Sequence, residues 1–169
     1  MSKAFTKEDD QTEVPVLVRL PSVSLPAGAK NYLTRDGAER LRKALERLIE
    51  VERPRLAALP EPAESKRQIQ SIDQRIRDLQ NSLETAVVAP LPEGPQEQVR
   101  FGSTVTVCER DGEQSTYRIV GVDETDLDRN WVSYLSPVAR ALMNARVGQR
   151  VRLRLPAGEK ELEIVSIGE

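Results

Sequence analysis

The stretch LAALPEPAESKRQ, residues 56–68, decides how the chain folds back on itself. Pro60 and Pro62 lie here between two segments that carry helical patterns. Because a proline lacks the backbone N–H and its ring clashes with the preceding turn, the two prolines end a helix. The stretch therefore predicts a tight turn between two helices, with Glu61 and Glu64 near its tip.

The segment before the turn predicts a helix that begins after Thr34. Thr34 has the side chain of an N-cap, although Gly37 in the first turn is a poor helix former. Pro54 interrupts the segment, so we expect a bend or a lost hydrogen bond there. An apolar stripe at spacings of three and four runs along both sides of this interruption, at Leu41, Leu45, Leu48, Leu56 and Leu59.

The segment after the turn predicts a second helix, for which Ser65 is the candidate cap. Its apolar stripe alternates steps of three and four residues, as in the seam of a coiled coil. Two such seams joined by a short turn pack antiparallel, so residues 31–85 predict an antiparallel coiled-coil hairpin. The stripe of the second helix consists of Ile69, Ile72, Ile76, Leu79 and Leu83.

Two further segments carry prolines and no sustained period. Residues 1–30 form an N-terminal extension that we expect to be extended or disordered, unless it docks locally through Val14, Val16 and Leu17. Residues 86–98 contain three prolines and a glycine, which exclude a helix or a central strand. We therefore expect a linker at 86–98.

Residues 99–169 predict a small antiparallel sheet with one short helix, in the order strand, strand, strand, helix, strand, strand. Asp111-Gly112 is a hairpin signal between the first two strands. Ser136 and Pro137 are the favoured N-cap and first residue of a helix. The chain is therefore predicted to be an α+β protein. The expected core of this part is Val105, Val107, Tyr117, Ile119, Val132, Leu142, Val151, Leu153, Leu162 and Ile164.

Composition excludes several classes of function. The chain of 169 residues contains no histidine, which removes Ser-His-Asp and Cys-His catalysis and the commonest metal ligand. The net charge of -2 gives no general reason to expect nucleic-acid binding. No apolar run approaches the ~20 residues that a membrane helix needs, and the N-terminus lacks the apolar part of a signal peptide. We expect a cytoplasmic protein with no membrane partner.

Several motifs in order resemble the Gre (GreA/GreB) factors of bacterial RNA polymerase. The matching stretches are NYLTRDGAERLRKALERL, VERP, IDQRIRDL, FGSTVTV, YRIVGVDE, SPVARALMNARVGQRV and LPAGEKELEIVSI, which together span residues 31–168. The run SPVARAL is fairly specific for this family and its relatives. The chain looks like a GreB-like member with a shortened coiled coil, related to the Rnk type.

The resemblance implies a fold and a partner. It implies an N-terminal coiled coil that enters the secondary channel of RNA polymerase and a C-terminal domain of the FKBP-like fold that docks at the rim. The polymerase-binding residues carried over are Asp123, Glu124, Ser136, Pro137 and Arg140. A purely structural reading is open for them, because Ser136 and Pro137 cap a helix and Arg140 can pair with the acidic loop.

The turn departs from the family pattern. Cleavage factors carry a longer tip with a glycine-aspartate start and a glutamate-asparagine-alanine run, whose acids help to hold a second Mg²⁺ at the polymerase active centre. Aligned on Arg53-Pro54 and Ile72-Asp73, this chain is shorter by roughly a dozen residues, or about 9 Å of rod at 1.5 Å per residue. Glu61 and Glu64 are candidate shortened counterparts; otherwise Glu64 favours a helix N-terminus and Glu61 is a solvated turn residue.

Three functions follow, in order of preference. The first is a monomeric regulator that binds RNA polymerase at the secondary channel, with weak or no stimulation of cleavage. The second is an active factor whose tip acids promote Mg²⁺-dependent cleavage of backtracked RNA. In both, the chain is not itself an enzyme, has no cofactor of its own, and meets Mg²⁺ and RNA only within the polymerase. The third is a peptidyl-prolyl isomerase, for which the candidate pocket aromatics are Phe101, Tyr117, Trp131 and Tyr134.

Overall fold

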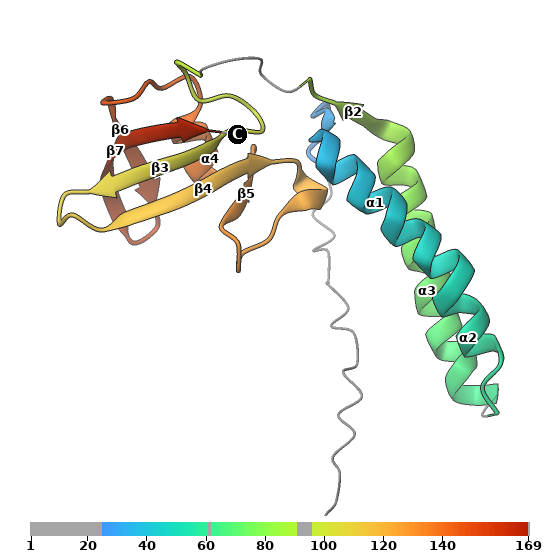
Figure 1. Cartoon of the computed structure of the whole chain (residues 1–169). Coiled ribbons are helices and arrows are strands. Elements are labelled where there is room, and N and C mark those ends of the chain that lie inside the picture. Colours follow the sequence, from blue (N-terminus) through green and yellow to red (C-terminus); the bar gives the residue numbers. More distant parts are fainter. Residues whose placement is uncertain (1–24, 61, 91–95, 169) are drawn as a thin grey trace, which may run out of the picture.

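A helical hairpin projects from one side of a five-stranded sheet (Figure 1). The computed structural model describes residues 25–60, 62–90 and 96–168. Most of the N-terminal extension, including the docking alternative through Val14, Val16 and Leu17, lies outside the described residues. So do Glu61 and the middle of the predicted linker.

The first arm of the hairpin consists of β1 (Asn31–Leu33), α1 (Arg35–Arg47), the π-helical segment η1 (Leu48–Glu52) and α2 (Arg53–Ala57). Thr34 caps α1 as predicted, because its side chain accepts a hydrogen bond of 3.0 Å from the backbone N–H of Gly37. The interruption expected at Pro54 takes the form of η1, a widened turn directly before the proline. A widened turn gives the ring room that a regular α-helical turn lacks.

The second arm is α3 (Pro62–Thr85), which begins before the predicted cap, Ser65. Ser65 is not its cap but a buried residue within its first turns, so that prediction is wrong. A proline is well suited to the first helical position, because the backbone N–H there has no partner within the helix.

The two apolar stripes meet between the arms. Leu41 and Leu48 of the first arm and Ile72 and Leu79 of the second are buried in one cluster, together with residues at the base of the hairpin. Leu59 is 45% exposed at the turn, which contradicts its place in the predicted stripe. The remaining members of this cluster are Leu33 and Ala38, with Ala44, Leu45, Leu56, Ile76, Leu83 and Ala86 partly buried against it.

A short parallel sheet closes the base of the hairpin. β2 (Ala86–Val88) pairs with β1, with Asn31 opposite Ala86 and Leu33 opposite Val88. The predicted linker is therefore wrong for residues 86–88, which precede its first proline, Pro90. This pairing brings together the two ends of a hairpin that are more than fifty residues apart in sequence.

The C-terminal sheet has the strand order β5-β4-β3-β7-β6. The predicted order of strands and helix is confirmed, but β5 pairs parallel to β4, so the sheet is not wholly antiparallel. Residues 121–130 carry the chain back far enough that Trp131 lies opposite Arg118. The elements are β3 (Thr104–Glu109), β4 (Gln114–Val120), η2 (Val122–Glu124), β5 (Trp131–Ser133), α4 (Pro137–Leu142), β6 (Arg150–Leu155) and β7 (Gly158–Gly168).

The predicted core of the sheet is confirmed, since seven of its ten residues are buried and Tyr117, Val132 and Val151 are partly buried against them. The hairpin predicted at Asp111-Gly112 forms between β3 and β4, and Gly112 adopts a φ of 89° that favours glycine. Val99, Ala139 and Ala145 complete the core and were not predicted.

We predict that Leu79→Ala lowers the free energy of unfolding by about 2–5 kcal/mol, because it removes a fully buried side chain and leaves a cavity between the arms. Leu59→Ala is the matched control and is expected to change stability much less, since its side chain is half exposed. Urea unfolding followed by circular dichroism measures both. Equal losses for the two variants would contradict the described packing.

A second prediction concerns pH. The Arg53 guanidinium donates a hydrogen bond of 2.7 Å to the Asp73 carboxylate across the hairpin and holds the pKa of Asp73 below its usual range. A lowered pKa stabilises the fold above the unfolded-state pKa of aspartate, and this contribution is lost as the pH falls through the lowered value. The melting temperatures of wild type and Asp73→Asn should therefore differ near neutral pH and converge in acid. A difference that persists in acid would contradict the pairing.

Candidate functional site

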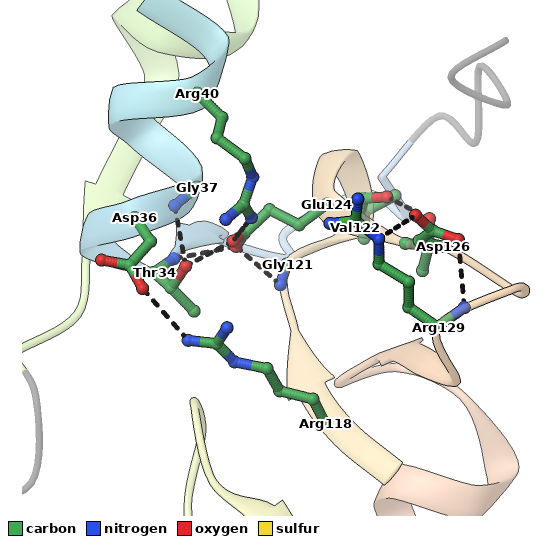
Figure 2. Close-up of polar contacts among 11 residues, drawn as sticks. Thr34, Asp36, Gly37, Arg40, Arg118, Gly121, Val122, Glu124, Asp126 and Arg129 are labelled. Carbon is green, nitrogen blue, oxygen red and sulfur yellow. Dashed lines mark hydrogen bonds and ion pairs between the residues drawn. The ribbon is translucent and has the colours of Figure 1, made fainter. Parts of the chain in front are cut away.

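The two acidic residues predicted to bind a partner, Asp123 and Glu124, lie on η2 and contact the base of the hairpin. Figure 2 shows the contacts of Glu124. Glu124 is buried, and its Oε2 accepts hydrogen bonds from the backbone N–H groups of Thr34, at 2.8 Å, and Gly121, at 3.0 Å. Its Oε1 accepts from the Thr34 hydroxyl and lies 3.3 Å from Nη2 of Arg40. One carboxylate thus joins the sheet to the start of α1.

Two glycines, Gly37 and Gly121, allow other atoms of this junction to approach the backbone closely. A Cβ atom on Gly37 would lie 1.9 Å from Oε1 of Glu124, and one on Gly121 would lie 2.0 Å from the backbone oxygen of Tyr32. Neither distance is compatible with a side chain. Gly37, which weakens α1 by its helix propensity, is required because Glu124 packs directly on the first turn of that helix.

Asp123 binds the other arm. Its Oδ2 accepts hydrogen bonds from the Ser82 hydroxyl on α3 and, at 3.4 Å, from the side-chain amide of Asn31 on β1. Asn31 also donates to the backbone oxygen of Ser82 at 3.0 Å. Glu124 therefore holds the start of the first arm and Asp123 the end of the second, and both oxygens of Glu124 and Oδ2 of Asp123 have partners within the chain.

Three arginine side chains lie against the ring of Trp131, beside this junction. The guanidinium carbons of Arg40, Arg118 and Arg129 lie 4.6, 5.1 and 5.3 Å from the centroid of the Trp131 ring. Arg118 also pairs with Asp36 of α1 at 3.4 Å. Arg40 and Asp36 belong to the hairpin and Trp131 and Arg118 to the sheet, so the cation–π contacts add a second connection between them.

Three aromatic side chains form a third connection. Tyr32 of β1 packs against Phe101 and Tyr134 of the C-terminal part, with ring centroids 5.8 and 5.6 Å apart, and Phe101 and Tyr134 are 5.9 Å apart. The Tyr134 hydroxyl donates to the backbone oxygen of Lys30 at 2.7 Å. Burial, with a smaller contribution from Tyr32, raises the pKa of Tyr134.

The other three predicted binding residues lie on α4 and differ in exposure. Ser136 caps the helix, since its hydroxyl accepts from the backbone N–H of Ala139 at 3.1 Å, and Pro137 occupies the first helical position. Pro137 and Arg140 are exposed. Among the residues that the structure describes, Arg140 has no side-chain hydrogen bond or ion pair, so it does not pair with the acidic loop. Pro137 and Arg140 are thus exposed, whereas Glu124 is buried and Asp123 is half-buried, with Oδ2 bonded to the hairpin.

The tip of the hairpin offers little for metal chemistry. Glu64 lies in the first turn of α3, is exposed, and accepts a hydrogen bond of 3.0 Å from the side-chain amide of Gln68. Glu61 lies outside the described residues. Across the described ranges, no three acidic or cysteine side chains gather as metal ligands. Within the same ranges, no helix is both long and apolar enough to cross a membrane.

Sequence reasoning missed the contacts of Glu124, although two signals point to them. A glycine in the first turn of a helix, three residues after a good N-cap, as at Gly37, indicates close approach by another group. Gly121 precedes Glu124 by three residues, which is the spacing at which a side-chain carboxylate returns to a backbone N–H. Neither signal identifies Thr34 as the partner, because the two segments are 90 residues apart.

Comparisons with known proteins identify the relatives of this chain. The family described as "Transcription elongation factor, GreA/GreB, C-term" matches residues 94–169. The transcription elongation factor GreB of Neisseria meningitidis is 39% identical over 152 residues, covering 82% of this chain and 93% of that protein. GreB of Pseudomonas aeruginosa is 42% identical over 149 residues, covering 80% and 88%. GreA factor homolog 1 of Thermus thermophilus is 30% identical, covering 83% and 100%, with a TM-score of 0.40 that is too low to compare the placement of parts.

We predict that Gly37→Ala destabilises the protein by about 1–3 kcal/mol, the cost of overpacking, because the new methyl group overlaps the Glu124 carboxylate. The sign of the stability change tests this contact, because a glycine-to-alanine substitution within a helix ordinarily stabilises a protein by about 0.5–1 kcal/mol. Urea unfolding measures the change.

The double variant Gly37→Ala/Glu124→Ala is the control for this prediction. It removes the overlapping carboxylate, so its loss of stability should be smaller than the sum of the two single losses. Strictly additive losses would show that the two residues do not contact each other.

Proposed function

Because the chain belongs to the GreA/GreB family of transcription elongation factors, we propose that it binds bacterial RNA polymerase at its secondary channel and regulates transcription with weak or no stimulation of transcript cleavage. The observation that carries the proposal is the hairpin itself. Its base is joined to the sheet through Glu124 and Asp123, and its long second arm, α3, leads from a short turn.

The length of the rod supports occupation of a channel over chemistry at its end. α3 has 24 residues and is therefore about 36 Å long at 1.5 Å per residue. Family resemblance indicates a tip about 9 Å shorter than that of cleavage factors. Mg²⁺ requires carboxylate oxygens at about 2.0–2.1 Å, a tolerance far smaller than this difference.

The exposed apolar residues around the turn also favour a hairpin end that takes no part in metal binding. Ala57, Ala58, Leu59, Pro60 and Ala63 are exposed and have no groups that bind a cation. Glu64 is already hydrogen-bonded by Gln68. The proposal includes no metal, no cofactor and no catalytic residue in this chain. Any Mg²⁺ would be held by the polymerase.

The remaining parts of the proposal extend the family assignment. The C-terminal sheet would dock at the channel rim through the exposed face of α4, with Pro137 and Arg140 in contact and Ser136 holding the helix start. We propose a cytoplasmic monomer that meets backtracked RNA only inside the polymerase. The classification of the sheet as FKBP-like and of the hairpin as a coiled coil are part of the same proposal.

Peptidyl-prolyl isomerase activity receives no support from the aromatic side chains. Such a site needs an apolar, aromatic-lined pocket. Phe101 and Tyr134 pack against Tyr32, and Trp131 is covered by arginines. A groove of about 260 Å³ over β3, β6 and β7 is lined mainly by charged residues, including Glu109, Arg110, Arg150, Glu161 and Glu163.

A transcript-cleavage assay tests the proposal. Stalled, backtracked complexes of RNA polymerase from the same source are mixed with wild type or with Glu61→Ala/Glu64→Ala, and binding is measured in parallel. We expect wild type to bind, to leave cleavage near the rate of polymerase alone, and to be unaffected by the double substitution.

The matched control is Glu46→Ala/Glu50→Ala, which removes two exposed acids from the first arm of the rod, away from the turn. Strong cleavage that disappears with the turn variant, but not with this control, would establish the active-factor alternative. Failure of wild type to bind polymerase would refute both the proposed regulator and the active-factor alternative.

A further inference from the structure

Leu127 is 87% exposed, whereas the other exposed large apolar side chains of the described residues are between 42% and 56% exposed. It lies in the loop that connects η2 to β5. Isolated exposed apolar residues are common on protein surfaces, so exposure alone does not identify a binding residue. The structure of the loop around Leu127 gives a second observation.

The loop from Asp126 to Trp131 is closed and braced. The backbones of Asp126 and Trp131 exchange two hydrogen bonds, at 3.1 and 2.8 Å. Oδ1 of Asp126 accepts from the backbone N–H groups of Asp128 and Arg129, at 3.1 and 3.2 Å. Asn130 donates to the backbone oxygen of Leu127 at 3.2 Å. The bonds on both sides of Leu127 fix the backbone that carries it.

A side-chain ion pair within the loop and a backbone hydrogen bond from the N–H of Arg118 on β4 also hold this loop. Nε of Arg129 lies 3.4 Å from Oδ2 of Asp126 (Figure 2). The guanidinium carbon of Arg129 lies 5.3 Å from the centroid of the Trp131 ring. The backbone oxygen of Asn130 accepts from Arg118 on β4 at 3.1 Å. A leucine held on such a support loses little conformational entropy when it binds, which is the property of an anchor residue in a protein interface.

The charged side chains near Leu127 indicate the chemistry of the surface that would bind it. Asp128 is exposed and, within the described part of the chain, its carboxylate has no hydrogen bond or ion pair. Asp126 is already paired with Arg129. Leu127 is thus flanked by one free negative charge, and Asp123 and Glu124 are occupied at the base of the hairpin. The complementary surface is an apolar pocket with a basic residue at its rim.

We propose that the loop Asp126–Trp131 is the principal anchor of this protein on RNA polymerase, with Leu127 inserted in an apolar pocket and Asp128 facing a basic group at its edge. The inference rests on the proposed function, because it takes polymerase as the partner. It adds a contact beside Pro137 and Arg140.

The test is the affinity of the full-length chain for RNA polymerase from the same source, measured by biolayer interferometry. Loss of a buried leucine side chain at an interface weakens binding by about tenfold or more, so Leu127→Ser should show at least that change. Leu127→Met keeps the apolar volume and should bind nearly as wild type does. Asp128→Asn should slow association at low salt and leave dissociation almost unchanged.

Val147→Ser is the matched control, because it removes another exposed aliphatic side chain from a loop of the same sheet. Unchanged affinity of Leu127→Ser, or an equal loss with Val147→Ser, would overturn the inference. A change in self-association of Leu127→Ser without a change in polymerase affinity would also overturn it and assign the loop to a second copy. Absence of wild-type binding would instead refute the proposed function. Unchanged melting temperatures establish that each variant is folded.

Discussion

The position of the hairpin relative to the sheet depends on one buried carboxylate. Glu124 binds the backbone and hydroxyl of Thr34, the backbone of Gly121 and the guanidinium of Arg40, all from a side chain that is 1% exposed. A buried charge is tolerated only when its oxygens are satisfied. A different angle between the hairpin and the sheet would separate the Glu124 carboxylate from its donors on Thr34 and Arg40. The buried carboxylate would then lack partners, which would destabilise that arrangement.

The two ends of the hairpin have different roles: one is fixed to the sheet and the other is free to enter a partner. One end of the hairpin is fixed to the sheet through Glu124, Asp123 and the aromatic contacts of Tyr32. The other end is the turn between α2 and α3, where Ala57, Ala58 and Leu59 are exposed. A rod held at its base can fill a channel to a defined depth. The chain therefore acts, in our proposal, through where it is placed and not through groups that react.

Local signals predicted most elements, and contacts between distant segments account for what was missed. Thr34 as a cap, Asp111-Gly112 as a turn and the start of α4 at Pro137 each depend on a few neighbouring residues. The pairing of β1 with β2, the parallel placement of β5 and the burial of Glu124 require partners many residues away. Family resemblance located Asp123 and Glu124 as important residues but could not distinguish contact with a partner from contact within the chain.

The stacking of arginines on Trp131 has a practical consequence. The chain contains a single tryptophan, so its indole emission comes from one place. That place is contacted at once by Arg40 from the hairpin and by Arg129 from the loop that carries Leu127. The molecule therefore contains its own optical reporter, positioned so that a tilt of the rod or a displacement of the loop alters the surroundings of the same fluorophore without any added label.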